Sequence, residues 1–214
     1  MKHILCYGDS NTWGCVPKVG GRYDLDHRWT GLLQRQLGAG YRVIEEGLNG
    51  RTTLWEDTAV PARRNGMAWL PTCLDSHRPL DLVVLMLGTN DLKTKFSLSP
   101  AEIAFGAARL VKEILSHKDW GPDGVNPPQV LMISPIHTCT EMPMPHLETF
   151  GNASHGRSLL LAEEYRRQAR ALGCHYFDAS TVAEPSPLDG LHLDEEGHRA
   201  LAQALTQQVR EILG

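Results

Sequence analysis

The chain has 214 residues, of which 42% are hydrophobic and 21% charged, and 21 Lys and Arg against 25 Asp and Glu give a formal net charge of −4. This balance is typical of a folded globular protein, and the length fits one domain over residues 1–214. The acidic excess argues against nucleic acid as a partner, because proteins that grip phosphates carry a basic surplus. No apolar run approaches the roughly 18 residues of a membrane helix, so we predict no membrane partner.

The N-terminal residues and the cysteines indicate the cellular compartment of the protein. The apolar stretch at residues 4–7 is too short for the core of a secretory signal peptide. The cysteines are five in number, widely spaced and without a Cys-x-x-Cys pair, so neither a disulfide framework nor a zinc knuckle is indicated. Both observations predict a cytoplasmic protein with free thiols.

Short apolar runs rich in β-formers recur along the chain and predict the strands of one sheet. Uninterrupted apolar runs of this length are typical of strands that are buried on both faces. In chain order the predicted strands span Lys2–Tyr7, Tyr41–Glu45, Asp81–Leu87, Gln129–Ser134 and, more weakly, His175–Asp178.

Segments of helical periodicity lie between and after these strands. Ser99, with Pro100 at the first helical position and Glu102 three residues after the cap, marks one helix start, Asp194 marks another, and Gly173 marks a helix end. The alternation of strands and helices predicts an α/β fold with a parallel sheet. The predicted helices span Trp29–Leu37, Gly66–Ser76, Ala101–His117, Ser158–Leu172 and Glu195–Leu213.

Three irregular segments remain, at residues 15–27, 121–128 and 138–154. The last is long for a compact domain and carries Pro143 and Pro145. Long loops of this kind are often functional. We expect it to act either as a wall of a substrate pocket or as an arm between subunits, and the sequence does not choose between these roles.

Polar residues follow the predicted strands where each strand ends. Gly8–Gly14, Gly47–Thr52 and Gly88–Asp91 follow the first three strands, and Asp189–His192 comes after the fifth. Ligands bind beyond the carboxyl ends of the strands in an open parallel sheet. These segments are therefore expected to meet at one rim of the sheet.

A hydroxyl, an imidazole and a carboxylate are among these residues. A serine hydroxyl such as that of Ser10 becomes a nucleophile when a neutral imidazole takes its proton, and His192 is the candidate base. Asp189, three residues earlier, can lie on the same side of a turn and fix the tautomer of His192. The backbone N–H groups of Ser10 and Gly50 and the side-chain amide of Asn90 are suitable donors to an oxyanion, each worth roughly 3 to 4 kcal/mol.

These motifs resemble, in order and spacing, the four sequence blocks of the SGNH, or GDSL, hydrolases. The blocks are Gly8–Ser10, Gly50, Gly88–Asp91 and Asp189-x-x-His192. The resemblance spans most of the chain. It implies a flavodoxin-like three-layer α/β/α fold with a five-stranded parallel sheet, and ester hydrolysis by a Ser-His-Asp triad and an oxyanion hole made of the residues just described.

Three stretches are similar to the arylesterase and acyltransferase branch, namely Gly8–Gly14, Leu48–Thr53 and Leu87–Asp91. That similarity implies short-chain aryl or alkyl esters as small-molecule substrates, acyl transfer to alcohols or peroxide, and a homo-oligomer. The sequence departs from the common family pattern at Asn11 and Asn49, which can reshape the acyl pocket. We therefore name Asp9, Asn11, Trp13 and Asn49 as candidate substrate-binding residues.

Other interpretations stay open at this point. The same residues suit a carbohydrate O-deacetylase, and the polar rim also suits a non-catalytic flavodoxin-like module that binds a phosphate or a sugar. A structural subunit is a third alternative. The histidines form no recognised metal-ligand spacing and no phosphate-binding Gly-rich motif is present, so we predict neither a metal nor a cofactor. The groups considered for a metal are His192 with Asp194 and His198, and His137 with His146 and His155.

Overall fold

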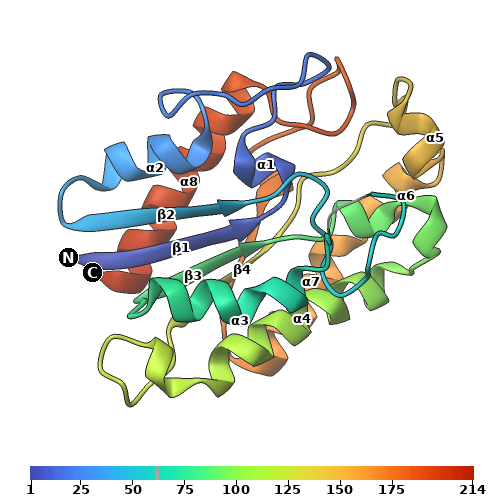
Figure 1. The fold of residues 1–214 in the computed structure, drawn as a ribbon. Helices are drawn as coiled ribbons and strands as arrows, with labels where there is room; N and C mark the ends of the chain where they lie inside the picture. Colours follow the sequence, from blue (N-terminus) through green and yellow to red (C-terminus); the bar gives the residue numbers. More distant parts are fainter. Residues whose placement is uncertain (61–62) are drawn as a thin grey trace.

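A computed structural model describes residues 1–60 and 63–214. Its centre is a parallel sheet of five strands in the order β2-β1-β3-β4-β5 (Figure 1). The predicted α/β class and parallel sheet are confirmed, and every strand begins and ends within two residues of the prediction. The strands are β1 (Lys2–Gly8), β2 (Tyr41–Gly47), β3 (Leu82–Met86), β4 (Gln129–Ser134) and β5 (His175–Asp178).

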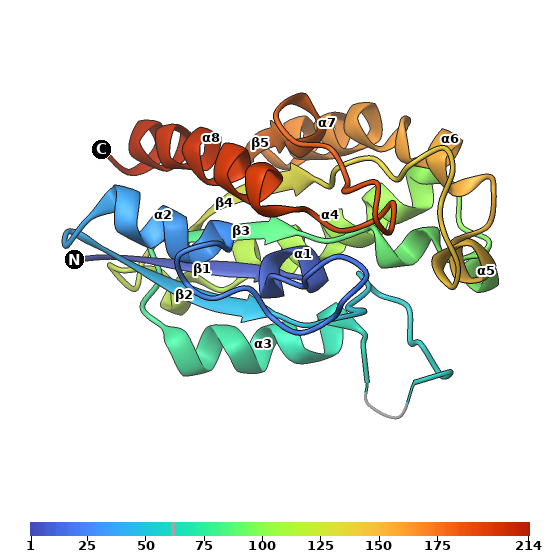
Figure 2. The same cartoon turned by 90° about the horizontal axis from the view of Figure 1, so that it is seen from above.

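Helices cover both faces of the sheet, which makes three layers. Figures 1 and 2 show α2 and α8 together on one face and α3, α4 and α7 on the other. The layers hold two apolar clusters, one on each side of the sheet. The long helices are α2 (Trp29–Leu37), α3 (Gly66–His77), α4 (Pro100–Ser116), α7 (Leu161–Leu172) and α8 (Glu195–Leu213).

Short helices occupy the connections. Three of them lie near the carboxyl end of the sheet: α1 (Ser10–Trp13), α5 (His146–Phe150) and α6 (Ser154–Ser158). The 3₁₀ turns are η1 (Asn90–Leu92), η2 (Thr94–Phe96), η3 (Lys118–Trp120) and η4 (Ala179–Thr181). The helix predicted over 158–172 corresponds to α7, which begins three residues later at Leu161, and Ser158 is the last residue of the separate helix α6. The segment 138–154 contains α5, which its two prolines concealed.

Helix ends follow the capping signals in the sequence. Ser99 and Glu102 form a complete capping box at the start of α4, and the Asp194 carboxylate accepts from the Gly197 amide at 2.9 Å at the start of α8. Gly173 ends α7 in the left-handed conformation with φ 68°. Each signal supplies partners for backbone groups that a helix end leaves free.

Burial differs between the central and edge strands. The side chains of β3 are all buried, and those of β1 and β4 are buried apart from their first residues. The prediction that all strands are buried on both faces is wrong for β2 and β5, whose residues are mostly half-buried. These two strands lie at the edges of the sheet, where only one neighbouring strand covers them. In β2, the Glu45 carboxylate pairs with the Arg28 guanidinium at 2.6 Å.

The end of β1 is closely packed and positions the helix α1. A Cβ on Gly8 would lie 2.0 Å from Thr12 Oγ1 and 2.8 Å from the Met86 carbonyl oxygen, so only glycine fits there. This lets the chain turn sharply from β1 into α1. Ser10, the first residue of α1, therefore lies just beyond the carboxyl end of β1, a strand in the interior of the sheet.

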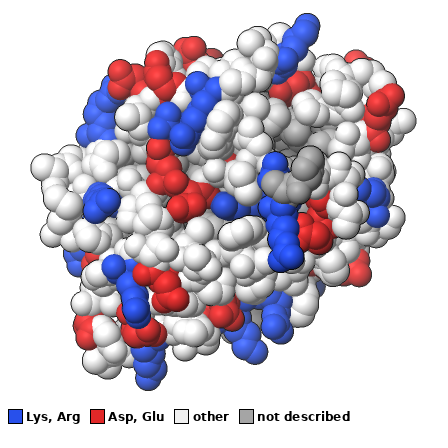
Figure 3. Space-filling view, in the orientation of Figure 1, with Lys and Arg blue, Asp and Glu red and all other residues white. Residues whose placement is uncertain are grey.

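Charged side chains of both signs share the surface. Basic and acidic side chains are interspersed on the face seen in Figure 3, without a broad area of one sign among the residues described there. In the described part of the chain, no helix combines the length and the apolarity that crossing a bilayer requires.

Candidate active site

A pocket of about 350 Å³ lies at the carboxyl end of the sheet. The strand order reverses at β1 and β3, the position where open α/β sheets bind ligands. Residues from all four sequence motifs line the pocket, as do residues of α5. They include Ser10, Asn49, Gly50, Asn90, Leu191 and His192.

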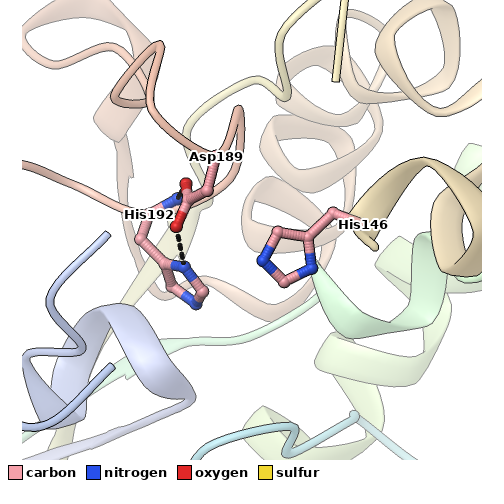
Figure 4. Close-up of side chains that lie close together, drawn as sticks. All are labelled: His146, Asp189 and His192. Atoms are coloured by element: carbon pink, nitrogen blue, oxygen red, sulfur yellow. Dashed lines mark hydrogen bonds and ion pairs between the residues drawn. The ribbon is translucent and has the colours of Figure 1, made fainter. Parts of the chain in front are cut away.

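Ser10, His192 and Asp189 form one chain of hydrogen bonds. His192 Nε2 lies 3.0 Å from Ser10 Oγ. On the other side of the ring, His192 Nδ1 lies 2.8 Å from Asp189 Oδ2, the bond drawn as a dashed line in Figure 4. All three side chains are buried, with at most 7% of each residue exposed. A carboxylate on Nδ1 holds the imidazole in the tautomer whose Nε2 can take a proton from the hydroxyl.

The loop around Asp189 holds the carboxylate as an anion. Asp189 Oδ1 accepts from the backbone N–H groups of Leu191 and His192, both at 3.0 Å, and Oδ2 accepts from that of Lys18 at 3.1 Å. Burial opposes ionisation, but the hydrogen bonds from His192 and the backbone hold the pKa of Asp189 well below its usual value. Burial likewise opposes charging of His192, and the bond to Asp189 outweighs it and raises the pKa of His192.

Asn11 joins the first motif to the last. Its side-chain amide donates to the Leu191 carbonyl at 3.3 Å, and its Oδ1 accepts from the Leu193 amide at 2.9 Å. The serine helix α1 and the His192 loop are therefore held together by a buried side chain. Asn11 is not among the residues that line the pocket, and its side-chain amide acts as a brace within the protein.

Gly50 and Asn90, which follow β2 and β3, line the same pocket as His192. Gly50 adopts φ 80°, a conformation that glycine takes without strain. Within the described residues, the Gly50 N–H has no acceptor. Asn90 Nδ2 donates to the Arg51 carbonyl at 3.1 Å, which fixes the plane of the Asn90 amide and leaves its second N–H free.

Buried bonds tie these segments to each other. Arg51 Nη1 donates to the Gly8 carbonyl at 2.9 Å, and Asp91 Oδ1 accepts from the Thr53 hydroxyl at 2.5 Å and from the Thr53 amide at 3.1 Å. Burial raises the pKa of Asp91 to about 6. The donors beyond β1, β2 and β3 are therefore held by contacts that are fully inside the protein.

A buried ion pair adds a further link on this side. Lys93 Nζ lies 2.9 Å from Asp57 Oδ2, and Lys95 pairs with the other oxygen of the same carboxylate. Burial of Asp57 opposes its charge, but the hydrogen bonds from Lys95 and Lys93 lower its pKa to about 2. Lys93 also lines the pocket, with its charge directed to Asp57.

A second, larger pocket of about 620 Å³ adjoins the first and shares Cys15, Pro145, His146 and His192 with it. The segment 138–154 supplies one side of both pockets, so it is a pocket wall in this chain. His146, at the start of α5, faces the imidazole of His192 with ring centroids 5.7 Å apart (Figure 4).

The four candidate substrate-binding residues differ in whether they line a pocket. Asn49 lines the smaller pocket and is exposed. Asp9 and Trp13 line neither pocket: the Asp9 carboxylate accepts from the Asn11 amide at 3.0 Å, and the Trp13 ring packs under the Arg22 guanidinium. The sequence interpretation missed Cys15, Lys93 and His146, because none of them follows a strand within a recognised motif.

Potential metal ligands come together once among the described residues, in a group other than those considered from the sequence. Atoms of His146, Asp189 and His192 lie within 4.8 Å of one another (Figure 4). Two members of the group already bond to each other, and His192 also contacts Ser10. The arrangement is therefore a hydrogen-bonded pair that a third, separate imidazole faces.

Comparisons with known proteins agree with this geometry. The whole chain aligns with the structure of an aryl esterase from M. smegmatis at 41% identity and TM-score 0.93, covering 100% of both chains. A carbohydrate acetylesterase from Sinorhizobium meliloti matches at 38% identity and TM-score 0.93, again over 100% of both chains. The fold and these neighbours define a carboxylic ester hydrolase of the SGNH type.

A sequence profile places the chain in its family. The profile of the GDSL-like lipase/acylhydrolase family matches residues 6–200, so the protein belongs to that family. A lipase/acylhydrolase from Enterococcus faecalis shares the fold at 18% identity and TM-score 0.68, with 99% of this chain and 96% of that chain covered. No curated protein matches the chain.

Proposed function

We propose that Ser10, His192 and Asp189 are the catalytic triad of an esterase for short acyl groups. The observation that carries this proposal is the unbroken line of hydrogen bonds from Asp189 through His192 to the Ser10 hydroxyl. In the first step, Ser10 Oγ attacks the ester carbonyl carbon and its proton passes to His192 Nε2. The C–O bond to the alcohol then breaks, and the leaving oxygen takes that proton from His192.

The second step releases the acyl group. Water attacks the acyl-enzyme carbonyl carbon and gives one proton to His192. The bond from that carbon to Ser10 Oγ then breaks, His192 returns the proton to Ser10 Oγ, and the acid leaves. An alcohol or hydrogen peroxide that attacks in place of water accepts the acyl group by the same route. Acyl transfer is therefore part of the proposal.

Three donors would hold the oxyanion of each tetrahedral intermediate. They are the backbone N–H groups of Ser10 and Gly50 and the free N–H of the Asn90 amide, and all three residues line one pocket. Fixed donors stabilise a developing charge without reorganising during the reaction. The bonds from Asn90 to Arg51 and from Asp91 to Thr53 support this preorganisation.

The size of the site supports short acyl groups. The pocket beside the donors has a volume of about 350 Å³, and the buried ring of Phe150 is part of its lining. A carbohydrate O-deacetylase is the second candidate, because it uses the same residues and a carbohydrate acetylesterase is among the close structural neighbours. A non-catalytic binding module is less well supported, because ligand binding alone does not require a serine hydroxyl that is hydrogen-bonded to a histidine which is itself paired with a carboxylate.

The test is hydrolysis of p-nitrophenyl acetate at pH 8 by the wild-type protein and by Ser10→Ala. We expect Ser10→Ala to lose at least about 10³-fold in kcat. A matched control is Ser116→Ala, which removes an exposed hydroxyl at the end of α4 whose hydrogen bond among the described residues is to the Glu113 carbonyl; it should keep full activity. A serine-directed phosphonate should label wild type and not Ser10→Ala. Full turnover by Ser10→Ala would contradict the proposal.

A further inference from the structure

His146 occupies a special position between the two pockets. It lines the smaller pocket, which carries the proposed oxyanion donors, and also the larger one, which contains Asp189 and His192 but none of those donors. In the proposed reaction the acyl group sits against the donors, and the leaving alcohol sits on the side of His192 that protonates it. The larger pocket is therefore the compartment of the alcohol.

The ring nitrogens of His146 are open to a ligand. The ring contacts Phe150 and His192 edge to face, but within the described residues neither ring nitrogen has a hydrogen-bond partner. Burial, together with the neighbouring His192, lowers the pKa of His146, so the ring is neutral near pH 7. A neutral imidazole offers one donor and one acceptor.

The surroundings of His146 make this polarity distinctive. Apolar residues make up much of the lining of the larger pocket, among them Val16, Pro143, Met144, Pro187 and Leu188, and its charged side chain besides Asp189 and His192 is that of Lys18. A few polar groups in a mostly apolar pocket fix the orientation of a ligand. The reason is that a polar atom of the ligand loses its hydrogen bonds to water on binding, which costs free energy unless a polar group of the pocket replaces them. His146 is thus the natural partner for a polar group on the alcohol.

The distance between His146 and His192 limits where the polar group of the alcohol can lie. A nitrogen of His146 lies within 4.8 Å of a nitrogen of His192, and the ring centroids are 5.7 Å apart. His192 serves the ester oxygen itself. A polar group of the alcohol that reaches His146 at the same time must therefore lie close to that oxygen. A hydroxyl on the carbon next to the one that bears the ester oxygen meets this condition.

We propose that His146 is a specificity-determining residue that binds a hydroxyl on the carbon next to the one that bears the ester oxygen. The enzyme would then prefer short acyl esters of vicinal diols and polyols over those of simple alcohols. The inference rests on the proposed triad mechanism and adds to it the class of the alcohol. His146 takes no part in the bond-breaking steps.

The experiment compares 2-hydroxyethyl acetate with propyl acetate, which differ by a hydroxyl in place of a methyl group. Acid release gives kcat/KM for each ester with wild type, His146→Phe and His146→Gln. Phenylalanine keeps a ring against His192 but has no polar atom, whereas glutamine keeps a donor and an acceptor. Because the hydroxyl also changes intrinsic reactivity, the quantity to follow is the ratio of the two kcat/KM values relative to wild type.

We expect His146→Phe to reduce this ratio about threefold to tenfold, the range of one hydrogen bond between neutral groups, and His146→Gln to retain part of the preference. If His146→Phe does not fold, His146→Leu replaces it. Met144→Ala removes an apolar wall of the same pocket and should change both esters by the same factor. A ratio that is the same in wild type and His146→Phe would overturn the inference.

The outcome separates this inference from the mechanism on which it depends. A protein whose triad works but whose His146 has no role would lose both activities in Ser10→Ala and keep its ratio in His146→Phe. If Ser10 were not the nucleophile, Ser10→Ala would still hydrolyse both esters. A displaced His192 in His146→Phe would lower both activities together and leave the ratio unchanged.

Discussion

The two sides of the pocket are built differently. On the strand-end side, Ser10, Gly50 and Asn90 each follow a strand and are joined through buried bonds such as that from Asn90 to the Arg51 carbonyl. On the other side, the segment 138–154 lines the pocket with Met144 59% exposed, and the contacts of the His146 ring within the described residues are ring contacts. The strand ends thus carry the residues proposed for the reaction, and the loop carries the residue proposed to select the substrate.

The largest expected effect comes from breaking the scaffold side at Asp189. Asp189→Asn removes the charge that orients His192, and kcat for p-nitrophenyl acetate should fall about 10⁴-fold with little change in KM. Asp194→Asn is the matched control, because Asp194 caps α8 without touching the triad. A loss in Asp189→Asn no greater than tenfold would contradict the role given to this carboxylate.

The next effect concerns the proposed oxyanion donors. Asn90→Ala should lower kcat about 10²-fold to 10³-fold, the usual cost of one such donor. The loss should be nearly equal for every ester tested, because the oxyanion is common to all of them. A loss that depends strongly on the alcohol would place Asn90 among the specificity residues and weaken the contrast between the two sides.

The smallest of these effects is a displacement of the pH profile. His192 must be neutral to take the Ser10 proton, and its pKa is raised above the ordinary 6.5. Below that raised pKa the protonated form dominates, so kcat/KM should fall about tenfold per pH unit as pH decreases. The midpoint should therefore lie above pH 6.5, and it should move down in the residual activity of Asp189→Asn. Constant kcat/KM down to pH 5 would contradict this assignment.

The scaffold side could be predicted from the sequence because its signals are local. Buried strands give uninterrupted apolar runs, and the turn after each strand carries the polar residues, so the chain order alone brings Ser10, Gly50, Asn90 and His192 to one rim. The predicted burial of the edge strands is too high, since a run such as that of β2 does not reveal how many neighbours the strand has.

The loop side could not be predicted in the same way. Residues 138–154 have no periodicity, and Pro143 and Pro145 conceal the short helix α5 that carries His146. That Asn11 shapes the acyl pocket stays a prediction. The structure adds that its amide binds Leu191 and Leu193, a long-range contact that no local pattern in the sequence reveals. The single domain, the homo-oligomer and the cytoplasmic location stay predictions, since neither the fold nor the site tests them.

The brace formed by Asn11 has a consequence for how activity arises. It joins residues that are 180 and 182 positions apart, and the helix that follows His192, α8, completes the apolar cluster on its face of the sheet. The segment that carries Ser10 is therefore held in place by residues that the ribosome adds about 180 positions later. The proposed triad can assemble only when both segments are present and packed together, so esterase activity would report that this long-range contact has formed.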